Sequence, residues 1–268
     1  MIKEYWLLIL LVLIWTILAI IFGIYDLDIS IELVNINSNW AKFLENYGMI
    51  PGLLVILSGV YIYYSYIKTK SDFWSYVQKV VFFLVSSGLI FYLFDIFLHI
   101  AESKYFITFL IISFSINIII FILLHIGKHV QGAIAISYSK VVVSIALFGY
   151  IICIQVAKYL WGRVRFRDLD AAFSQFTPWY SPQGFTGYDS FPSGHAAMGW
   201  MLLALLILFV NKKPWVKYLV FALIFLYAVI LALSRVVIGA HYASDVLFGS
   251  FFIIITYLLI YKHYTNQT

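Results

Sequence analysis

The sequence has few charged residues and a single cysteine for its length. Only 11% of its 268 residues are charged and 64% are hydrophobic, whereas soluble domains have about 25% charged residues. A soluble core cannot bury this apolar excess, so a soluble enzyme and a disordered chain are both excluded. Cys153 has no second cysteine in the chain to pair with, which excludes a disulfide scaffold. The net charge of +5 is too small for a nucleic-acid-binding protein.

The sequence is instead rich in long hydrophobic runs. A helix needs about 20 mainly apolar residues to cross the hydrocarbon core of a bilayer. The stretches that approach this length are residues 5–25, 49–67, 77–100, 105–126, 134–157, 196–210, 216–234 and 243–262. The sequence therefore predicts an all-α, polytopic transmembrane bundle of about eight spans, with the sixth extended back to Gly194. Six spans plus a hairpin at 77–126 is the alternative, because very few polar residues separate those two runs.

The distribution of lysine and arginine predicts the orientation. With the N-terminus inside, the inner segments contain ten basic and two acidic residues, and the outer segments contain seven basic and ten acidic residues. The inner basic residues are Lys3, Lys68, Lys70, Lys79, Lys128, Lys140, Lys212, Lys213, Lys217 and Lys262. Because basic loops remain on the cytoplasmic side, both termini are predicted to lie inside. The protein is expected to be a multi-pass component of the cell (plasma or inner) membrane.

Two outer segments are long enough to fold over the membrane surface. Residues 26–48 are expected to form a short amphipathic helix in the headgroup layer. Residues 161–193 contain three of the five prolines and are expected to form a loop.

Polar residues gather at the outer ends of the predicted spans, where their cost implies a function. The group comprises Lys158, Arg165, Ser193, Gly194, His195, Arg235, His241 and Asp245. Three fixed positive charges suit a phosphate. The backbone N–H groups at a helix start near Ser193 and Gly194 also favour an anion.

Two histidines complete this chemistry. His241 and Asp245 are spaced i, i+4, so a helix would place them on one face. The carboxylate would accept the Nδ1–H of His241 and leave Nε2 free to attack. His195 is available as a general acid. Together these residues predict phosphoryl transfer through a phosphohistidine, and neither a metal nor a cofactor is expected.

The motifs resemble a known signature. Lys158-x6-Arg165, Pro192-Ser193-Gly194-His195 and Ser234-Arg235-x5-His241-x3-Asp245 are similar to the three-part signature of the type-2 phosphatidic acid phosphatase superfamily. That superfamily includes membrane lipid phosphatases, glucose-6-phosphatase and the vanadium haloperoxidases, and the bacterial membrane branch fits best.

The resemblance implies a role for each residue. The phosphoryl oxygens would be bound by Lys158, Arg165, Arg235, Ser193 and the amide of Gly194. His195 would protonate the leaving group, His241 would attack phosphorus and Asp245 would orient it. The family works without metal, and in bacterial membrane members the site typically faces the outer side.

One departure lies in the first motif. Phe166 follows Arg165, where the family usually has proline, so an altered loop geometry is expected. Two further arginines, Arg163 and Arg167, are expected to widen the anion-binding site as accessory residues.

These observations favour a phosphatase that acts on a phospholipid or a polyprenyl phosphate or diphosphate at the outer face. Residues 1–268 are expected to form one integral membrane domain, with residues 1–133 as N-terminal spans and residues 134–262 as the catalytic helical core. A lipid or anion transporter or binding protein is one alternative, and a lipid phosphotransferase using the same site is another. Asn117, in the middle of a span, is expected to form an interhelical hydrogen bond rather than a transport site.

Overall fold

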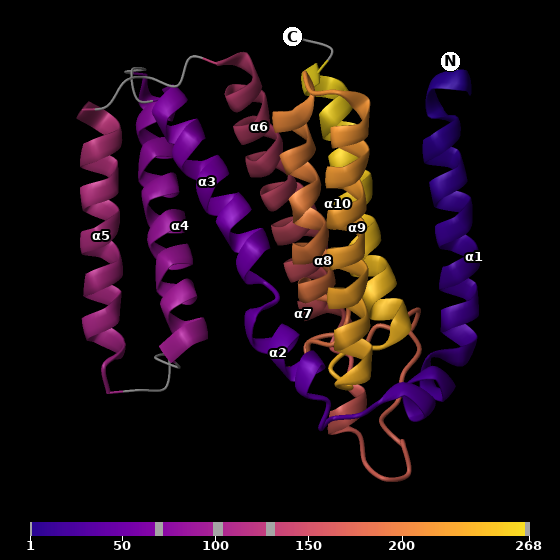
Figure 1. Ribbon diagram of the computed structural model, residues 1–268. Helices are drawn as coiled ribbons and strands as arrows, with labels where there is room; N and C mark the ends of the chain where they lie inside the picture. Colours follow the sequence, from indigo (N-terminus) through magenta and orange to yellow (C-terminus); the bar gives the residue numbers. More distant parts are fainter. Residues whose placement is uncertain (1, 68–71, 99–103, 127–131, 266–268) are drawn as a thin grey trace.

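The computed structural model describes residues 2–67, 72–98, 104–126 and 132–265, and the regular secondary structure within them is helical. In chain order the helices are α1 (Ile2–Leu33), α2 (Asn39–Tyr47), α3 (Ile50–Ile67), α4 (Phe73–Leu98), α5 (Phe106–Ile126), α6 (Ala133–Ser144), η1 (Ile145–Val156), α7 (Ala157–Trp161), η2 (Phe166–Asp168), α8 (Gly194–Met201), η3 (Leu202–Phe209), α9 (Pro214–Val237) and α10 (Ala243–Thr265). The predicted all-α bundle is confirmed (Figure 1).

Within the described residues, seven helical segments are long and apolar enough to cross a membrane. The remaining predicted stretch, the sixth in the chain, begins at Gly194, as expected, and forms the shorter apolar segment Gly194–Phe209. This segment runs alongside the longer helices of the bundle (Figure 1). In place of the hairpin alternative, α4 and α5 are two full-length helices that pack against each other.

The helices are arranged around a central group. Helices α8, α9 and α10 pack together with α6 and η1, and α3 packs against α6 and α8. Helix α4 packs mainly against α3 and α5, so the α4–α5 pair forms one flank of the bundle, whereas α1 lies on the other flank and packs mainly against α10 (Figure 1). The core is therefore formed by the later helices and α3.

The fifth span departs from a simple α-helix. Residues Ile145–Val156 form a π-helix between α6 and α7, although the sequence predicts one continuous α-helix over 134–157. The wider turn changes which side chains share a face, and π-helical segments are often found at functional sites. Tyr150, Gln155 and Lys158 consequently line the same cavity.

The predicted helix at 26–48 is wrong in its boundary. Helix α1 continues to Leu33, and the separate surface helix α2 starts only at Asn39. Asp26 and Ser30, four residues apart, lie on one face of α1, and both are buried. The part of α1 beyond the predicted span therefore remains helical and buries these two polar side chains against the bundle.

The start of α1 and the end of α10 lie at one end of the bundle, and α2 and the 161–193 loop lie at the other (Figure 1). Together with Gly194–Phe209, the seven longer segments make an even number of passes through the bundle, which produces this arrangement. Three of the predicted inner residues (Lys68, Lys70 and Lys128) lie outside the described residues. The side of the membrane that each end faces stays a prediction.

The expected role of Asn117 is confirmed. Its amide nitrogen donates to the Phe83 carbonyl and to Ser87 Oγ, both at 2.8 Å, and its amide oxygen accepts from Ser86 Oγ at 3.1 Å. Its amide oxygen also accepts from the hydroxyl of Tyr61 at 2.8 Å. The side chain thus joins α3, α4 and α5, as polar residues at helix interfaces in membranes do.

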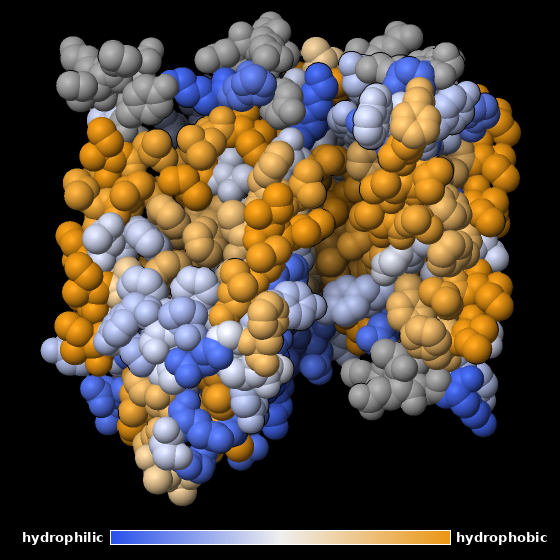
Figure 2. All heavy atoms as spheres, turned by 180° about the vertical axis from the view of Figure 1, so that it is seen from behind, coloured by the Kyte–Doolittle hydropathy of each residue, from blue (hydrophilic) through white to orange (hydrophobic). Residues whose placement is uncertain are grey.

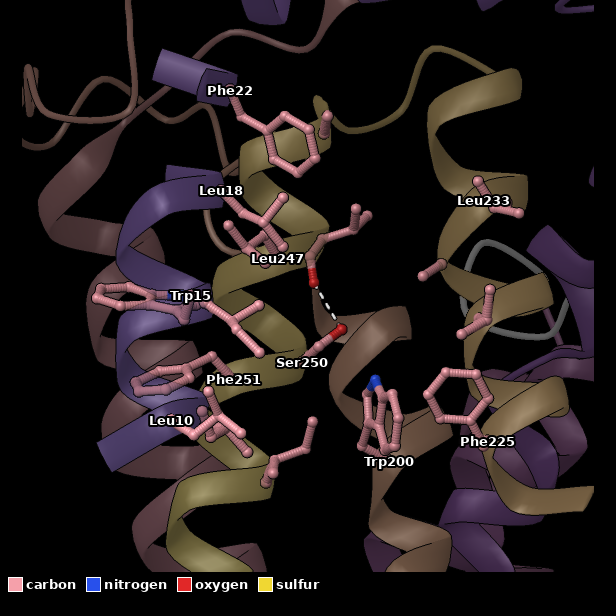
Figure 3. Close-up of a pocket in the computed structure, with 17 residues that line it drawn as sticks. Leu10, Trp15, Leu18, Phe22, Trp200, Phe225, Leu233, Leu247, Ser250 and Phe251 are labelled. Atoms are coloured by element: carbon pink, nitrogen blue, oxygen red, sulfur yellow. Dashed lines mark hydrogen bonds between the residues drawn. The ribbon is translucent and has the colours of Figure 1, made fainter. Parts of the chain in front are cut away.

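A large apolar cavity lies between part of α1 and the helices α8, α9 and α10. It has a volume of about 690 Å³, and its walls include Trp15 from α1 together with side chains of α8, α9 and α10 (Figure 3). The hydroxyl of Ser250 in its wall donates to the Val246 carbonyl at 2.7 Å. The polar residues that the sequence singles out are not in this cavity.

Candidate active site

The predicted polar residues converge at the end of the bundle that contains α2. They surround a cavity of about 290 Å³ that is also lined by Glu45 of α2 and Tyr92 of α4. The predicted residues that line it are Lys158, Arg165, Arg167, Gly194, His195, Arg235 and His241. Ser193 and Asp245 are fully buried and contact the cavity-lining segments from behind. The motifs therefore form one site.

His241 presents one ring nitrogen to this cavity. Its Nδ1 lies 2.5 Å from the Ser190 carbonyl oxygen and 3.6 Å from Asp245 Oδ2. Because a carbonyl oxygen only accepts hydrogen bonds, Nδ1 carries the proton and Nε2 keeps its lone pair. Burial, together with Lys158 and Arg235, outweighs Asp245 and lowers the pKa of His241 to about 4. The imidazole is therefore neutral near pH 7.

The expected helical stacking of His241 on Asp245 is wrong. Helix α10 begins at Ala243, so His241 precedes it and is positioned by the turn that follows α9. Asp245 lies in the first turn of α10, where the helix dipole favours a carboxylate. It accepts hydrogen bonds from Ser190 Oγ at 2.6 Å and from the Tyr242 amide at 2.9 Å.

His195 lies at the start of α8. Its Nε2 is 3.0 Å from the Glu45 carbonyl oxygen, so in this state Nε2 carries a proton and donates it. Ser193 is the N-cap of the same helix, and its hydroxyl oxygen accepts from the Ala196 amide at 3.4 Å. A Cβ on Gly249 would lie 2.3 Å from the Ser193 carbonyl oxygen. Glycine there allows α10 to approach the start of α8.

Four cations and two carboxylates face the cavity. Asp189 binds Lys158 Nζ at 3.3 Å and Arg165 NH2 at 2.6 Å. Glu45 Oε1 binds Arg167 NH1 at 2.9 Å and Arg235 NH2 at 3.0 Å. We call these six residues the cavity cluster. Burial alone would raise the pKa of Asp189, but Lys158 and Arg165 outweigh burial and lower it.

Several arginine nitrogens in this cluster are available to an anion. Nε and NH1 of Arg235 and Nε of Arg165 are buried and have no hydrogen-bond partner among the described residues. Buried donors are normally paired, so unpaired guanidinium nitrogens at one cavity indicate a binding site for oxygen atoms of a ligand. This observation fits the phosphate-binding role predicted for both arginines.

Arg163 does not widen the anion site, contrary to expectation. It is 1% exposed, and its guanidinium is fully engaged. Nε donates to the Thr177 carbonyl at 2.8 Å, NH1 lies 2.6 Å from Asp245 Oδ1, and NH2 lies 2.9 Å from Asp26 Oδ2. We call Asp26, Arg163 and Asp245 the buried cluster. Arg167 does line the cavity, so its accessory role stays a prediction.

Phe166 occupies the place of the usual proline without changing the backbone before it. Arg165 is extended, with φ −72° and ψ 150°, which is the conformation that a following proline would favour. The Phe166 ring stacks on Phe173 with centroids 5.7 Å apart. The backbone at Arg165 is therefore extended without a following proline, and the Phe166 side chain packs within the loop instead.

The acidic partners of the cations were missed by sequence reasoning. Asp26, Glu45 and Asp189 lie outside the three motifs, and only the excess of acidic residues on the outer side pointed to them. Nothing in the sequence pattern pointed to Ser190, which hydrogen-bonds both His241 and Asp245. Within the described residues, no group of three or more histidine, cysteine or acidic side chains is arranged to hold a metal ion.

Comparison with known proteins supports the grouping of these motifs. Residues 137–268 match the model of the PAP2 superfamily, and this match contains all three motifs and the helices that carry them. No curated protein and no solved structure matches the sequence significantly. The C-terminal half of the chain, residues 137–268, thus belongs to the PAP2 superfamily, which indicates phosphatase activity toward phosphate esters.

Proposed function

We propose that this protein is a membrane phosphatase that hydrolyses a lipid phosphate or prenyl diphosphate at the outer face through a phosphohistidine on His241. The observation that carries the proposal is the position of the His241 ring. Its Nδ1–H is held by the Ser190 carbonyl, and its remaining nitrogen faces a cavity lined by Lys158, Arg165 and Arg235. A nucleophile beside fixed cations is the arrangement that phosphoryl transfer requires.

The first step forms the phosphoenzyme. The phosphate binds the unpaired nitrogens of Arg165 and Arg235, and its oxygens replace the carboxylates of Asp189 and Glu45. Nε2 of His241 attacks phosphorus as the bond to the ester oxygen breaks. The leaving oxygen takes the Nε2 proton of the His195 imidazolium, whose second ring proton comes from the substrate phosphate bound as its monoanion. His195 thereby becomes neutral, and it must release its hydrogen bond to the Glu45 carbonyl. Asp245 stabilises the positive charge that develops on the His241 ring.

The second step regenerates the enzyme. Water attacks the phosphorus of the phosphohistidine while neutral His195 takes a proton from that water. The N–P bond then breaks, His241 returns to its neutral form and phosphate leaves. An alcohol in place of water would make the same site a phosphotransferase.

The surroundings of the cavity favour a lipid substrate. Met49, Tyr92 and Tyr150 line the cavity on the side of α3, α4 and η1. A second cavity of about 380 Å³ shares Lys158 and Asp189 with the site. Figure 2 shows a hollow between the α4–α5 flank and the middle of the bundle. The cations lie at the end of the spans, so a phosphate can bind at headgroup depth while its hydrocarbon chain remains in the bilayer.

The test is release of phosphate by the purified protein in detergent with a chelator present. Phosphatidic acid and a prenyl diphosphate are the substrates, and His241→Ala is expected to lower kcat by at least about 10³-fold. His125→Ala is the matched control, because His125 is exposed in the last turn of α5. Retention of activity in His241→Ala would disprove the mechanism.

A labelling experiment separates the enzyme from a transporter. Wild-type protein mixed briefly with ³²P-labelled substrate and quenched at alkaline pH is expected to carry label on histidine. An anion transporter or binding protein would carry none, and neither would His241→Ala.

A further inference from the structure

Helix α1 carries a buried carboxylate that the proposed mechanism does not use. Many side chains of this helix are exposed on the outside of the bundle, but Asp26 is fully buried. A buried charge is costly unless it is paired and hydrogen-bonded. Arg163 pairs with it, because NH2 of the arginine lies 2.9 Å from Asp26 Oδ2.

Asp26 is also joined to the start of α10. Its Oδ1 accepts from the Ser244 amide at 2.9 Å, and its Oδ2 accepts from the Ser244 hydroxyl. Arg163 NH1 donates to the same Ser244 hydroxyl oxygen at 2.8 Å and to Asp245 Oδ1 at 2.6 Å. A continuous set of contacts therefore runs from α1 through Arg163 to Asp245, whose other oxygen is 3.6 Å from His241 Nδ1.

The contacts of the Arg163 side chain hold its guanidinium group in one orientation. Its guanidinium carbon lies 3.9 Å from the centre of the Tyr242 ring, and each of its three nitrogens has an acceptor. Arg163 is therefore one of the groups that fix the position of Asp245 Oδ1. Asp26, in turn, is one of the groups that fix the position of Arg163.

The charges in this buried cluster make Asp26 important for reactivity. Two carboxylates and one guanidinium give a net charge of about −1 beside the imidazole of His241. Positive charge develops on that ring as Nε2 bonds to phosphorus, and a negative environment stabilises it. Arg163 with Asp245 alone would be a neutral pair and would stabilise that charge less.

We propose that Asp26 is a positioning residue of the active site. Through Arg163 it holds Asp245 in place beside His241, so that α1, which lies outside residues 137–268, takes part in the reaction. This inference rests on the proposed function of His241.

The main test compares two carboxylates of the same helix. Asp26→Asn is expected to lower kcat for phosphatidic acid by about tenfold while KM changes by less than about twofold. Asp28→Asn is the matched control, because Asp28 is exposed two residues away, and its kcat is expected to equal that of the wild type. An unchanged kcat in folded Asp26→Asn protein, or a loss confined to KM, would overturn the proposal.

A second variant keeps the proposal testable if Asp26→Asn does not fold. Ser244→Ala removes the hydroxyl shared by Asp26 and Arg163 and leaves all three charges in place. We expect kcat to fall by about threefold at constant KM. If kcat in folded Ser244→Ala protein equals that of the wild type, the contact chain has no role in the reaction.

A spectroscopic measurement tests the link without turnover. In protein with ¹⁵N-labelled histidine, Asp26→Asn is expected to lower the pKa of His241 further, because it removes a negative charge that acts through Asp245. The other charged or titratable groups near His241 are Asp189, Lys158, Arg235 and His195, and they are the same in the Asp28→Asn control. An unchanged His241 titration refutes the link. Wild-type protein without phosphatase activity would instead refute only the proposed function.

Discussion

The two ion-pair clusters at this end of the bundle use the same side-chain chemistry in opposite environments. In the cavity cluster, the side chains of Asp189 and Glu45 are 49% and 25% exposed. In the buried cluster, the side chains of Arg163, Asp26 and Asp245 are at most 1% exposed. One cluster has access to solvent and ligand, and the other does not.

Because of this difference in exposure, the two clusters are suited to different roles. Exposed ion pairs contribute about 0–1 kcal/mol, so a phosphate can replace the half-exposed carboxylate of Asp189 at little cost. A buried pair loses far more when one partner is removed, because the remaining charge stays buried and unpaired. The cavity cluster can therefore change partners during a reaction, whereas the buried cluster keeps the nucleophile in place throughout.

The largest expected effect comes from breaking the buried cluster. Arg163→Met leaves two carboxylates unpaired and is expected to lower the free energy of unfolding by about 3–5 kcal/mol. Arg167→Met removes a partly exposed partner of Glu45 and is expected to cost less than about 1 kcal/mol. Unfolding in mixed detergent micelles by increasing the fraction of SDS measures both. Equal losses would show that burial does not distinguish the clusters.

His241 lies between the two clusters. Its pKa therefore shows whether the cavity cations or Asp245 of the buried cluster has the larger influence on the ring. Burial and the cavity cations Lys158 and Arg235 outweigh Asp245 and lower its pKa to about 4. A lowered pKa keeps the ring neutral, and thus nucleophilic, as the pH falls through the usual histidine range of about 6.5. Activity that depends on this neutral form is retained down to about pH 4 and is lost about tenfold for each unit below it.

The measurement is an NMR titration of ¹⁵N-labelled histidine, with His241→Gln used to assign the signal. Protonation of His241 near pH 6.5 would mean that Asp245 offsets both burial and the cavity cations. The acid limb of the phosphatase activity then has to follow the same pKa, after correction for the ionisation of the substrate phosphate.

The sequence predicted the cavity more completely than the buried cluster. Lys158, Arg165 and Arg235 could be found because cations at span ends are costly and were grouped in motifs of fixed spacing. Asp26 could not, since its partner Arg163 is 137 positions away and helix α1 looks like an ordinary apolar span. The burial of Arg163, which turned an expected phosphate ligand into a scaffold residue, depends on three-dimensional packing.

The helix boundaries, too, could be predicted from the sequence only in part. The eight apolar stretches predicted the helices because their length must match the bilayer. The π-helix in the fifth span and the extension of α1 to Leu33 had no counterpart in the hydrophobic pattern. Both are set by contacts with other helices, and both affect the site, because they place Tyr150 at the cavity and Asp26 in the buried cluster.

The smallest expected effect comes from removing a competing carboxylate from the cavity cluster. Asp189→Asn leaves Lys158 and Arg165 without their carboxylate, so orthovanadate, a phosphate analogue, is expected to inhibit about threefold to fivefold more tightly, as about 1 kcal/mol of competition is removed. Asp170→Asn is the control, because Asp170 lies in the same loop and hydrogen-bonds Ser174 instead. Weaker inhibition would mean that Asp189 holds the two cations in their binding positions. In that case the cavity cluster would be a scaffold as well, and exposure alone would not separate the two clusters.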